Sequence, residues 1–292
     1  MNSNITGKKI FMTGATSGLG KVAALHVAGL GANVTVLARD KKKAEKLINE
    51  FKLKFPACTG NIDFVEGNLN SFASVVSACN YYKSKSLQPD TIIHNAGIMN
   101  FKPVTTENGI EETLQVNLLS PMLINHILMP EIDSNRECRV IFTASGLHQG
   151  EINFENIEFK GNFSSFRVYR QSKLGVILLV RFLNKKLSEQ NISFYSNHPG
   201  LVRTELSRNA GWFPKLIFWF MGKSPEKGAE TLIHLLESDK NDLSGGEYYA
   251  YNKVKSITPQ SYDMETAAKL LKVTEDYLKE YLNKPSIIFQ VS

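Results

Sequence analysis

The sequence predicts a single α/β domain built on a doubly wound parallel sheet with helices on both faces. Short apolar segments alternate with longer helix-like segments along most of the 292 residues. A glycine-rich turn joins the first apolar segment to the first helix-like one. Polar or glycine residues follow five of the apolar segments. The carboxyl ends of parallel strands lie at the same edge of a sheet, so these residues would share that edge. Doubly wound sheets bind their ligands there.

The elements follow from the apolar pattern and the breaks between its segments. We expect strands over residues 9–13, 33–38, 62–66, 91–94, 139–143, 192–197 and 245–250. We expect helices over residues 21–30, 41–55, 71–86, 106–129, 166–180, 223–238 and 263–283. The chain contains no linker, internal repeat or low-complexity segment, so residues 1–292 are predicted to form one domain.

The composition is that of an ordinary globular protein, with 42% hydrophobic and 21% charged residues. The formal net charge is +6, but no basic stripe with interleaved aromatic residues accompanies it, so we expect no nucleic-acid partner. The six histidines are scattered without metal-ligand spacing, and no metal site is predicted.

Cysteine usage and the N-terminal residues predict a compartment. The three cysteines lie far apart and form no Cys-x-x-Cys pair, which favours reduced thiols in a reducing compartment. The first residues form no apolar signal segment, and no stretch reaches 18 apolar residues. We therefore expect a cytoplasmic protein without a membrane-spanning helix.

The glycine-rich turn is the first candidate binding site. Gly14, Gly18 and Gly20 lie between the first strand and the first helix. Glycine lets the backbone approach a pyrophosphate closely, and free N–H groups at a helix N-terminus attract it. This context favours a Rossmann-type dinucleotide fold, although the spacing differs from the common Gly-x-Gly-x-x-Gly. A plain tight turn is the alternative.

The end of the second strand favours NADP over NAD. In a dinucleotide fold this point meets the adenosine ribose, where an acid binds the 2′-hydroxyl and an arginine accommodates a 2′-phosphate. Here Ala38 leaves room, Arg39 offers a guanidinium, and Asp40 comes one position later. The alternative is that Arg39 is a solvated charge and Asp40 caps the next helix.

Tyr169 and Lys173 are the candidate acid and its activator. Residues i and i+4 of a helix share one face, and a neighbouring cation lowers the pKa of a phenol. A free tyrosine titrates near 10, too high for efficient proton transfer at neutral pH. The spacing alone carries little weight, because Tyr81, Tyr249 and Tyr251 are also followed by lysine at i+4.

Taken together, these residues resemble the short-chain dehydrogenase/reductase family over about residues 6–250. The resemblance rests on motifs in the family's order and at its usual intervals: residues 13–20, Asn95-Ala96-Gly97, Asn117, Ser145, Tyr169-x-x-Ser172-Lys173 and Pro199-Gly200. Within the family, the chain is most similar to the retinol-dehydrogenase-like branch. That similarity rests on residues 150–157, 169–174 and 198–206.

The resemblance implies hydride transfer between NADP(H) and a carbonyl or alcohol. Tyr169 would be the acid/base, Lys173 would lower the pKa of Tyr169 and bind the nicotinamide ribose, and Ser145 would hold the carbonyl oxygen. Asn117 would hold a water that links Lys173 to solvent, and Thr204 would bind the nicotinamide carboxamide. The other implied cofactor contacts are Gly14, Ser17, Gly18, Leu19, Gly20, Arg39, Asn68, Leu69, Asn95, Ala96, Gly97, Pro199, Gly200 and Val202.

Three of these residues also have simpler interpretations. Asn117 would bend its helix through a buried hydrogen bond, Ser145 would be a turn serine, and Thr204 would cap a helix. The chain also departs from the family's pattern. His94 replaces the first residue of the usual Asn-Asn-Ala-Gly, and Asn68 replaces an aspartate that usually touches the adenine. Ser17 stands where many NADP-binding members carry a basic residue, so the NADP prediction depends on Arg39.

Residues 203–222 are the candidate substrate lid, because the family builds its lid after the sixth strand. The part from 212 to 221 is rich in aromatic residues, which suits a lipophilic substrate such as a retinoid, a steroid, a fatty aldehyde or a xenobiotic ketone. Peripheral membrane contact and ordinary core are the alternatives for this segment. A homo-oligomer is consistent with the family. A catalytically silent NADP(H)-binding regulatory or scaffold protein is the alternative function.

Overall fold

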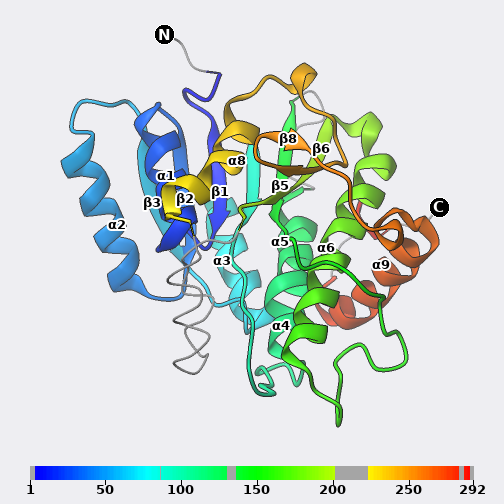
Figure 1. Ribbon diagram of the computed structural model, residues 1–292. Helices are drawn as coiled ribbons and strands as arrows, with labels where there is room; N and C mark the ends of the chain where they lie inside the picture. Colours follow the sequence, from blue (N-terminus) through cyan, green and yellow to red (C-terminus); the bar gives the residue numbers. More distant parts are fainter. Residues whose placement is uncertain (1–3, 86, 130–135, 201–222, 283–285, 290–292) are drawn as a thin grey trace.

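The computed structural model describes residues 4–85, 87–129, 136–200, 223–282 and 286–289. Its centre is one eight-stranded sheet with the order β3-β2-β1-β4-β5-β6-β7-β8 (Figure 1). The strands β1 to β7 run parallel and β8 is antiparallel to β7. The predicted doubly wound sheet is therefore confirmed. The strand order reverses between β1 and β4, and this reversal is where such sheets bind ligands.

The described strands are β1 (Lys9–Thr13), β2 (Asn33–Ala38), β3 (Asn61–Glu66), β4 (Thr91–His94), β5 (Cys138–Thr143), β6 (Ile192–His198), β7 (Tyr248–Ala250) and β8 (Lys253–Val254). The described α-helices are α1 (Gly18–Gly29), α2 (Lys41–Lys54), α3 (Phe72–Ser84), α4 (Glu112–Leu114), α5 (Ser120–Leu128), α6 (Ser165–Lys186), α8 (Pro225–Glu237) and α9 (Met264–Leu278).

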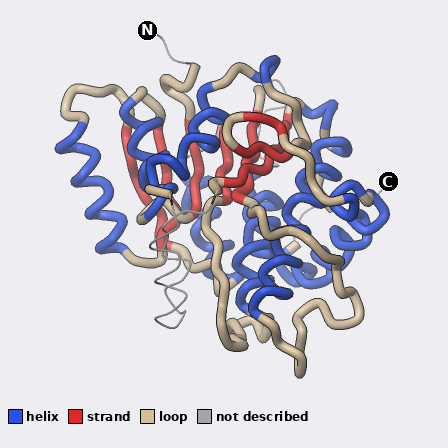
Figure 2. The backbone as a smooth tube through the Cα atoms, in the orientation of Figure 1, coloured by secondary structure: helices blue, strands red, loops and turns tan. Residues whose placement is uncertain are grey.

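Helices cover both faces of the sheet because successive strand residues point to opposite sides. In β1, Phe11 joins one apolar cluster, whereas Ile10 and Met12 join the other. The Phe11 cluster includes residues of α3, α5, α6 and α9, and the second cluster includes residues of α1, α2 and α8. Figure 2 shows the strands as a central layer between these two groups of helices.

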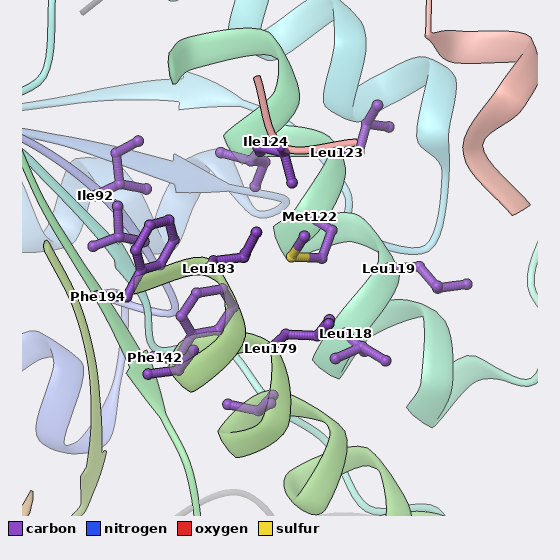
Figure 3. Close-up of a cluster of buried hydrophobic side chains, with 14 of the residues drawn as sticks. Ile92, Leu118, Leu119, Met122, Leu123, Ile124, Phe142, Leu179, Leu183 and Phe194 are labelled. Carbon is purple, nitrogen blue, oxygen red and sulfur yellow. The ribbon is translucent and has the colours of Figure 1, made fainter. Parts of the chain in front are cut away.

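The helix α6, which carries Tyr169, packs on an apolar core. Ile92, Phe142 and Phe194 project from β4, β5 and β6 toward α5 and α6 (Figure 3). Leu179 and Leu183 of α6 are at most 1% exposed in this cluster. Full burial of such a side chain contributes about 1.5–3 kcal/mol. The continuous apolar face of α6 therefore fixes this helix against β4, β5 and β6.

One sequence prediction about the elements was wrong, and one strand was missed. The helix expected over residues 106–129 begins only at Glu112, because Thr106 and Ile110 close a tight turn through Gly109 at φ +73°. Residues Gln115–Leu119 then form a π-helical stretch rather than α-helix. The strand β8 was not predicted. It follows Tyr251 and Asn252, both at positive φ, which is the twist that a two-residue hairpin turn requires.

His94, at the end of β4, is a buried histidine held in its neutral form. Its Nε2 lies 2.8 Å from Asn125 Oδ1, and its ring centroid lies 4.4 Å from that of Phe142. Burial lowers the pKa of His94 to about 4, although the bond to Asn125 opposes this. Its Nδ1 has no hydrogen-bond partner among the described residues. An uncharged ring therefore suits this position.

We expect acid destabilisation from His94. The unfolded histidine titrates near 6.5 and the folded one near 4. Above pH 6.5 both states are neutral. Between pH 6.5 and 4 only the unfolded state gains the proton. The free energy of unfolding therefore decreases as the pH is lowered, by up to about 3 kcal/mol from this group.

Urea unfolding of wild type and His94→Asn at pH 7, 6, 5 and 4.5 measures this contribution. Other buried histidines add to the wild-type slope. The variant should therefore lose only part of the pH dependence of its unfolding free energy. Identical slopes in the two proteins would contradict the assignment of His94.

Candidate active site

A cavity of about 630 Å³ lies at the carboxyl ends of the parallel strands. Loops that follow β1, β2, β3, β4, β5 and β6 line it, together with the start of α1 and one face of α6. Its size falls within the range of small-molecule and cofactor sites. Segments far apart in the sequence thus meet around one cavity.

The glycine turn has the geometry of an anion-binding loop. Gly14 and Gly18 have φ values of +70° and +57°, which favour glycine. A Cβ on Gly14 would lie 2.6 Å from the Ala96 backbone nitrogen, so this position has no room for a side chain. Within the described structure the Ser17 side chain does not cap α1. The N-terminus of α1 faces the cavity with its N–H groups, which suits a pyrophosphate.

A chain of side-chain hydrogen bonds ties the strand ends together at this edge. Asn95 Nδ2 donates to the Gly14 carbonyl at 2.8 Å, and Thr143 Oγ1 donates to Asn95 Oδ1 at 3.2 Å. Asn197 Nδ2 donates to Thr143 Oγ1 at 3.3 Å, and the Ala96 N–H donates to Thr13 Oγ1 at 3.1 Å. These bonds join the ends of β1, β4, β5 and β6, so the floor of the cavity is rigid.

The end of the cavity next to β2 and α2 carries two cationic side chains. Arg39 is exposed at the end of β2 and lines the cavity with Lys43, which lies in the first turn of α2. Asp40 caps α2, because its Oδ1 accepts from the Lys43 N–H at 3.1 Å. The alternative proposed for Asp40 from the sequence is thus what its side chain does here.

Tyr169, Lys173 and Ser145 meet at the other end of the cavity. Tyr169 and Lys173 come from one face of α6, and Lys173 Nζ lies 5.7 Å from the centroid of the Tyr169 ring. Lys173 Nζ donates to the Thr143 carbonyl at 2.8 Å. The Leu147 N–H donates to Ser145 Oγ at 3.1 Å. All three side chains line the cavity, so a bound carbonyl can reach both hydroxyl groups.

The protonation of this group differs from the sequence expectation in one respect. The sequence predicts that Lys173 lowers the pKa of Tyr169. In the structure burial raises the pKa of Tyr169, and a hydrogen bond from Ser145 opposes this. Burial also lowers the pKa of Lys173 to about 8. Burial is therefore the main influence on the pKa of Tyr169, and it acts in the direction opposite to the one expected from Lys173.

Asn117 lies behind the cavity rather than in its wall. It is buried in the π-helical stretch, where Oδ1 accepts from the Ile98 N–H at 2.8 Å and Nδ2 donates to the Ile98 carbonyl at 3.0 Å. Nδ2 also donates to Ser172 Oγ at 3.0 Å. The buried hydrogen bond considered as the simpler interpretation is thus present. A Cβ on Gly97 would lie 3.2 Å from Lys173 Nζ and 3.4 Å from Asn117 Oδ1, so both side chains approach Gly97 closely.

Asn68 lines the cavity on the β3 side. Its Oδ1 accepts from the Asn70 N–H at 3.1 Å, and its own N–H donates to Ser74 Oγ at 3.0 Å. The Leu69 carbonyl accepts from Gln115 Nε2 at 3.2 Å and from Ser120 Oγ at 2.6 Å. These bonds fix the loop that the sequence assigned to the adenine.

Most of the residues predicted from the sequence gather around the cavity. Those that line it are Gly14, Ser17, Gly18, Leu19, Gly20, Arg39, Asn68, Leu69, Asn95, Ala96, Gly97, Ser145, Tyr169, Lys173, Pro199 and Gly200. Asn117 supports the wall from behind. Val202, Thr204 and the candidate lid at residues 203–222 lie outside the described residues.

Sequence reasoning missed other residues of the cavity wall. Lys43 had a signal, since it lies four residues after Arg39 in the first turn of the predicted helix. Leu147 and His198 also line the wall, and His198 directly precedes the predicted Pro199-Gly200 pair. No group of three or more metal-ligating side chains occurs within the described ranges. Among the helices that the structure describes, none is long and apolar enough to cross a membrane.

Comparison with known proteins agrees with this geometry. A family model for short chain dehydrogenases matches residues 8–212. The chain belongs to the short-chain dehydrogenase family. Retinol dehydrogenase 14 of Mus musculus is 31% identical over 284 residues, which cover 92% of this chain and 85% of that protein. Such relatives confirm the retinol-dehydrogenase-like branch that the motifs predicted.

Solved structures share the fold. An uncharacterized protein from Mycobacterium paratuberculosis superimposes with a TM-score of 0.76 at 24% identity, covering 95% of each chain. A blue fluorescent protein from a metagenomic library, in complex with NADPH, superimposes with a TM-score of 0.67 at 20% identity, covering 85% of this chain and 97% of that one. At these identities the similarity establishes the fold alone.

We predict that Asn117→Ala destabilises the protein beside the cavity. The change leaves the Ile98 N–H and carbonyl without partners, which lowers the free energy of unfolding by about 2–4 kcal/mol in urea denaturation. Asn156→Ala is a matched control, because Asn156 makes the same pair of bonds to the backbone of Lys160 at an exposed site. Water replaces those bonds, so its loss should stay below about 1 kcal/mol. Equal losses in the two variants would contradict the structural role of Asn117.

Proposed function

We propose that the protein is an NADP(H)-dependent oxidoreductase that interconverts a lipophilic carbonyl and its alcohol. The observation that carries this proposal is the composition of the single cavity described above. One end presents the hydroxyl groups of Ser145 and Tyr169 beside the buried Lys173, and the other end presents Arg39 and Lys43. The α1 N-terminus lies between them. A dinucleotide fits this order of groups, and its nicotinamide would supply the hydride.

Each polar group at the reacting end has a distinct part in the chemistry. Tyr169 donates its phenolic proton to the carbonyl oxygen during reduction and accepts a proton from the alcohol in the reverse direction. Ser145 donates a hydrogen bond to the same oxygen as negative charge develops on it. Lys173, held by the Thr143 carbonyl, would bind the nicotinamide ribose and would favour the tyrosinate electrostatically.

The lipophilic substrate is supported by the relatives and by the cavity wall. The curated relatives include retinol dehydrogenases. At the Ser145 end, Leu147 is 40% exposed and lines the cavity. We propose retinoids, steroids, fatty aldehydes and xenobiotic ketones as the substrate class. Peripheral membrane contact through residues 212–221 and homo-oligomer formation remain predictions.

Turnover tests the assignment of Tyr169. NADPH oxidation with a panel of retinal, steroid, fatty-aldehyde and quinone substrates should be readily measurable in the wild type. Tyr169→Phe should lower kcat by roughly 10²- to 10⁴-fold, because it removes the proton donor. Tyr81→Phe is the matched control, since Tyr81 is also followed by a lysine at i+4 but lies exposed on α3.

Two results would contradict the proposal in different ways. Retention of most activity by Tyr169→Phe would show that another group is the acid. Tight NADPH binding without turnover on any substrate of the panel would support the alternative of a catalytically silent NADP(H)-binding protein.

Arg39→Ala tests the choice of cofactor. Loss of a charge-assisted hydrogen bond to the 2′-phosphate costs about 1.5–3 kcal/mol, so Kd for NADPH should rise about 10- to 100-fold while Kd for NADH stays nearly constant. Fluorescence titration of both cofactors measures this. Lys52→Ala, at an exposed position in the last turn of α2, is the control and should leave both values unchanged. An equal rise for both cofactors would count against recognition of a 2′-phosphate by Arg39.

A further inference from the structure

The peptide unit that follows Ser145 is held at both of its polar atoms by histidine side chains. The Ser145 carbonyl accepts from His148 Nδ1 at 2.9 Å. The Gly146 N–H donates to His198 Nδ1 at 3.1 Å. These two groups belong to one planar unit, so the two bonds together fix its orientation. That orientation in turn limits where the Ser145 side chain can point.

Tyr248 supports both histidines from β7. The His198 ring stacks on it, with centroids 6.1 Å apart and planes at 12°. The His148 ring lies against it at 5.3 Å. Tyr248 is buried, with 4% of its surface exposed. The two imidazoles therefore rest on one rigid ring and cannot move freely away from the Ser145–Gly146 peptide.

The space around Gly146 is matched to this contact. A Cβ at Gly146 would lie 3.2 Å from His198 Nε2, closer than an ordinary van der Waals contact. The absence of a side chain at position 146 thus lets the His198 ring approach the backbone. His198 extends from the end of β6, next to β5, from which the Ser145 loop departs.

The directions of the two bonds require different tautomers. His148 must carry its proton on Nδ1 to donate to a carbonyl, whereas His198 must leave Nδ1 unprotonated to accept from an N–H. Burial, together with the nearby His148 and Lys223, lowers the pKa of His198 to about 4. Burial also lowers the pKa of His148. Both rings are therefore neutral near pH 7, as the accepting role of His198 requires.

We propose that His148 and His198 are positioning residues that hold the Ser145 hydroxyl in place opposite Tyr169. They act through the Ser145–Gly146 peptide and not by touching the reacting atoms. The Leu147 N–H completes the arrangement, because it donates to Ser145 Oγ at 3.1 Å and leaves the hydroxyl proton for another acceptor. This inference rests on the proposed function for its catalytic consequence, but not for the geometry of the two bonds.

Paired substitutions at His198 separate positioning from general structural effects. Asparagine can place Oδ1 where histidine places Nδ1, so His198→Asn keeps an acceptor for the Gly146 N–H, whereas His198→Leu removes it. We expect His198→Leu to lower kcat by roughly 10- to 100-fold, as small misplacements of catalytic groups do, while Kd for NADPH changes less than about twofold. His198→Asn should recover most of kcat.

The same comparison applies to His148. Asparagine can place Nδ2 where histidine places Nδ1, so His148→Asn keeps a donor for the Ser145 carbonyl and His148→Leu does not. Equal kcat in wild type and both leucine variants would overturn the inference. A loss in His198→Leu that His198→Asn does not recover would also overturn it, because the hydrogen bond would not be the cause.

Amide hydrogen exchange tests the geometry without turnover. Measured by NMR, exchange of the Gly146 amide should be about tenfold faster in His198→Leu than in wild type and nearly unchanged in His198→Asn. Unchanged exchange in His198→Leu would overturn the inference whatever the activity. If amide exchange changes as expected in the variants but the wild type shows no turnover, the proposed function fails. The inferred hydrogen bonds to the Ser145–Gly146 peptide still stand in that case.

Discussion

Lys173 places an ammonium group where almost no water reaches it, and much of the site is arranged around that group. It is 3% exposed and donates to the Thr143 carbonyl. A buried charge is costly unless it is hydrogen-bonded. The carbonyl of Thr143, the last residue of β5, accepts that hydrogen bond where the strand end meets α6. That meeting depends on the apolar packing of α6 against β4, β5 and β6 (Figure 3). The position of Tyr169 on the same helix face follows from it.

The polar bonds between strand ends give this arrangement its rigidity. Asn95 links the Gly14 carbonyl to Thr143, whose hydroxyl also accepts from Asn197. Thr143 therefore contacts both the strand-end network and Lys173, through its side chain and its carbonyl respectively. The glycine turn and the end of the cavity that carries Ser145, Tyr169 and Lys173 are held to the same floor. Preorganised polar groups of this kind do not have to reorient during a reaction.

Two of the residues predicted for the site, Asn117 and Ser145, lie in backbone segments that are neither regular α-helix nor strand. The π-helical stretch directs Asn117 toward Ile98 and Ser172, and the loop after β5 carries Ser145 between His148 and His198. In both places side chains satisfy backbone groups that regular structure would otherwise pair. π-Helical turns are frequently found at functional sites.

Much of the fold and of the cavity followed from the sequence because local patterns encode them. Apolar runs gave the positions of the strands, and the glycines after β1 indicated where the backbone approaches another segment closely. The alternation of strands and helices then placed Asn95, Ser145 and Pro199-Gly200 at one edge of the sheet. Element limits were less well predicted around residues 106–111, since a Thr106–Ile110 turn there depends on a single glycine.

The sequence by itself determined the fold class, the family and many of the residues that line the cavity, because burial pattern, glycine positions and motif order are properties of the chain. The tertiary structure alone decided that burial raises the pKa of Tyr169, that Asn117 bonds to Ile98, and that His148 and His198 hold one peptide. Each depends on segments distant in the sequence that only packing brings together. Solvent exclusion and hydrogen-bond partners arise from that packing, and no local pattern contains them.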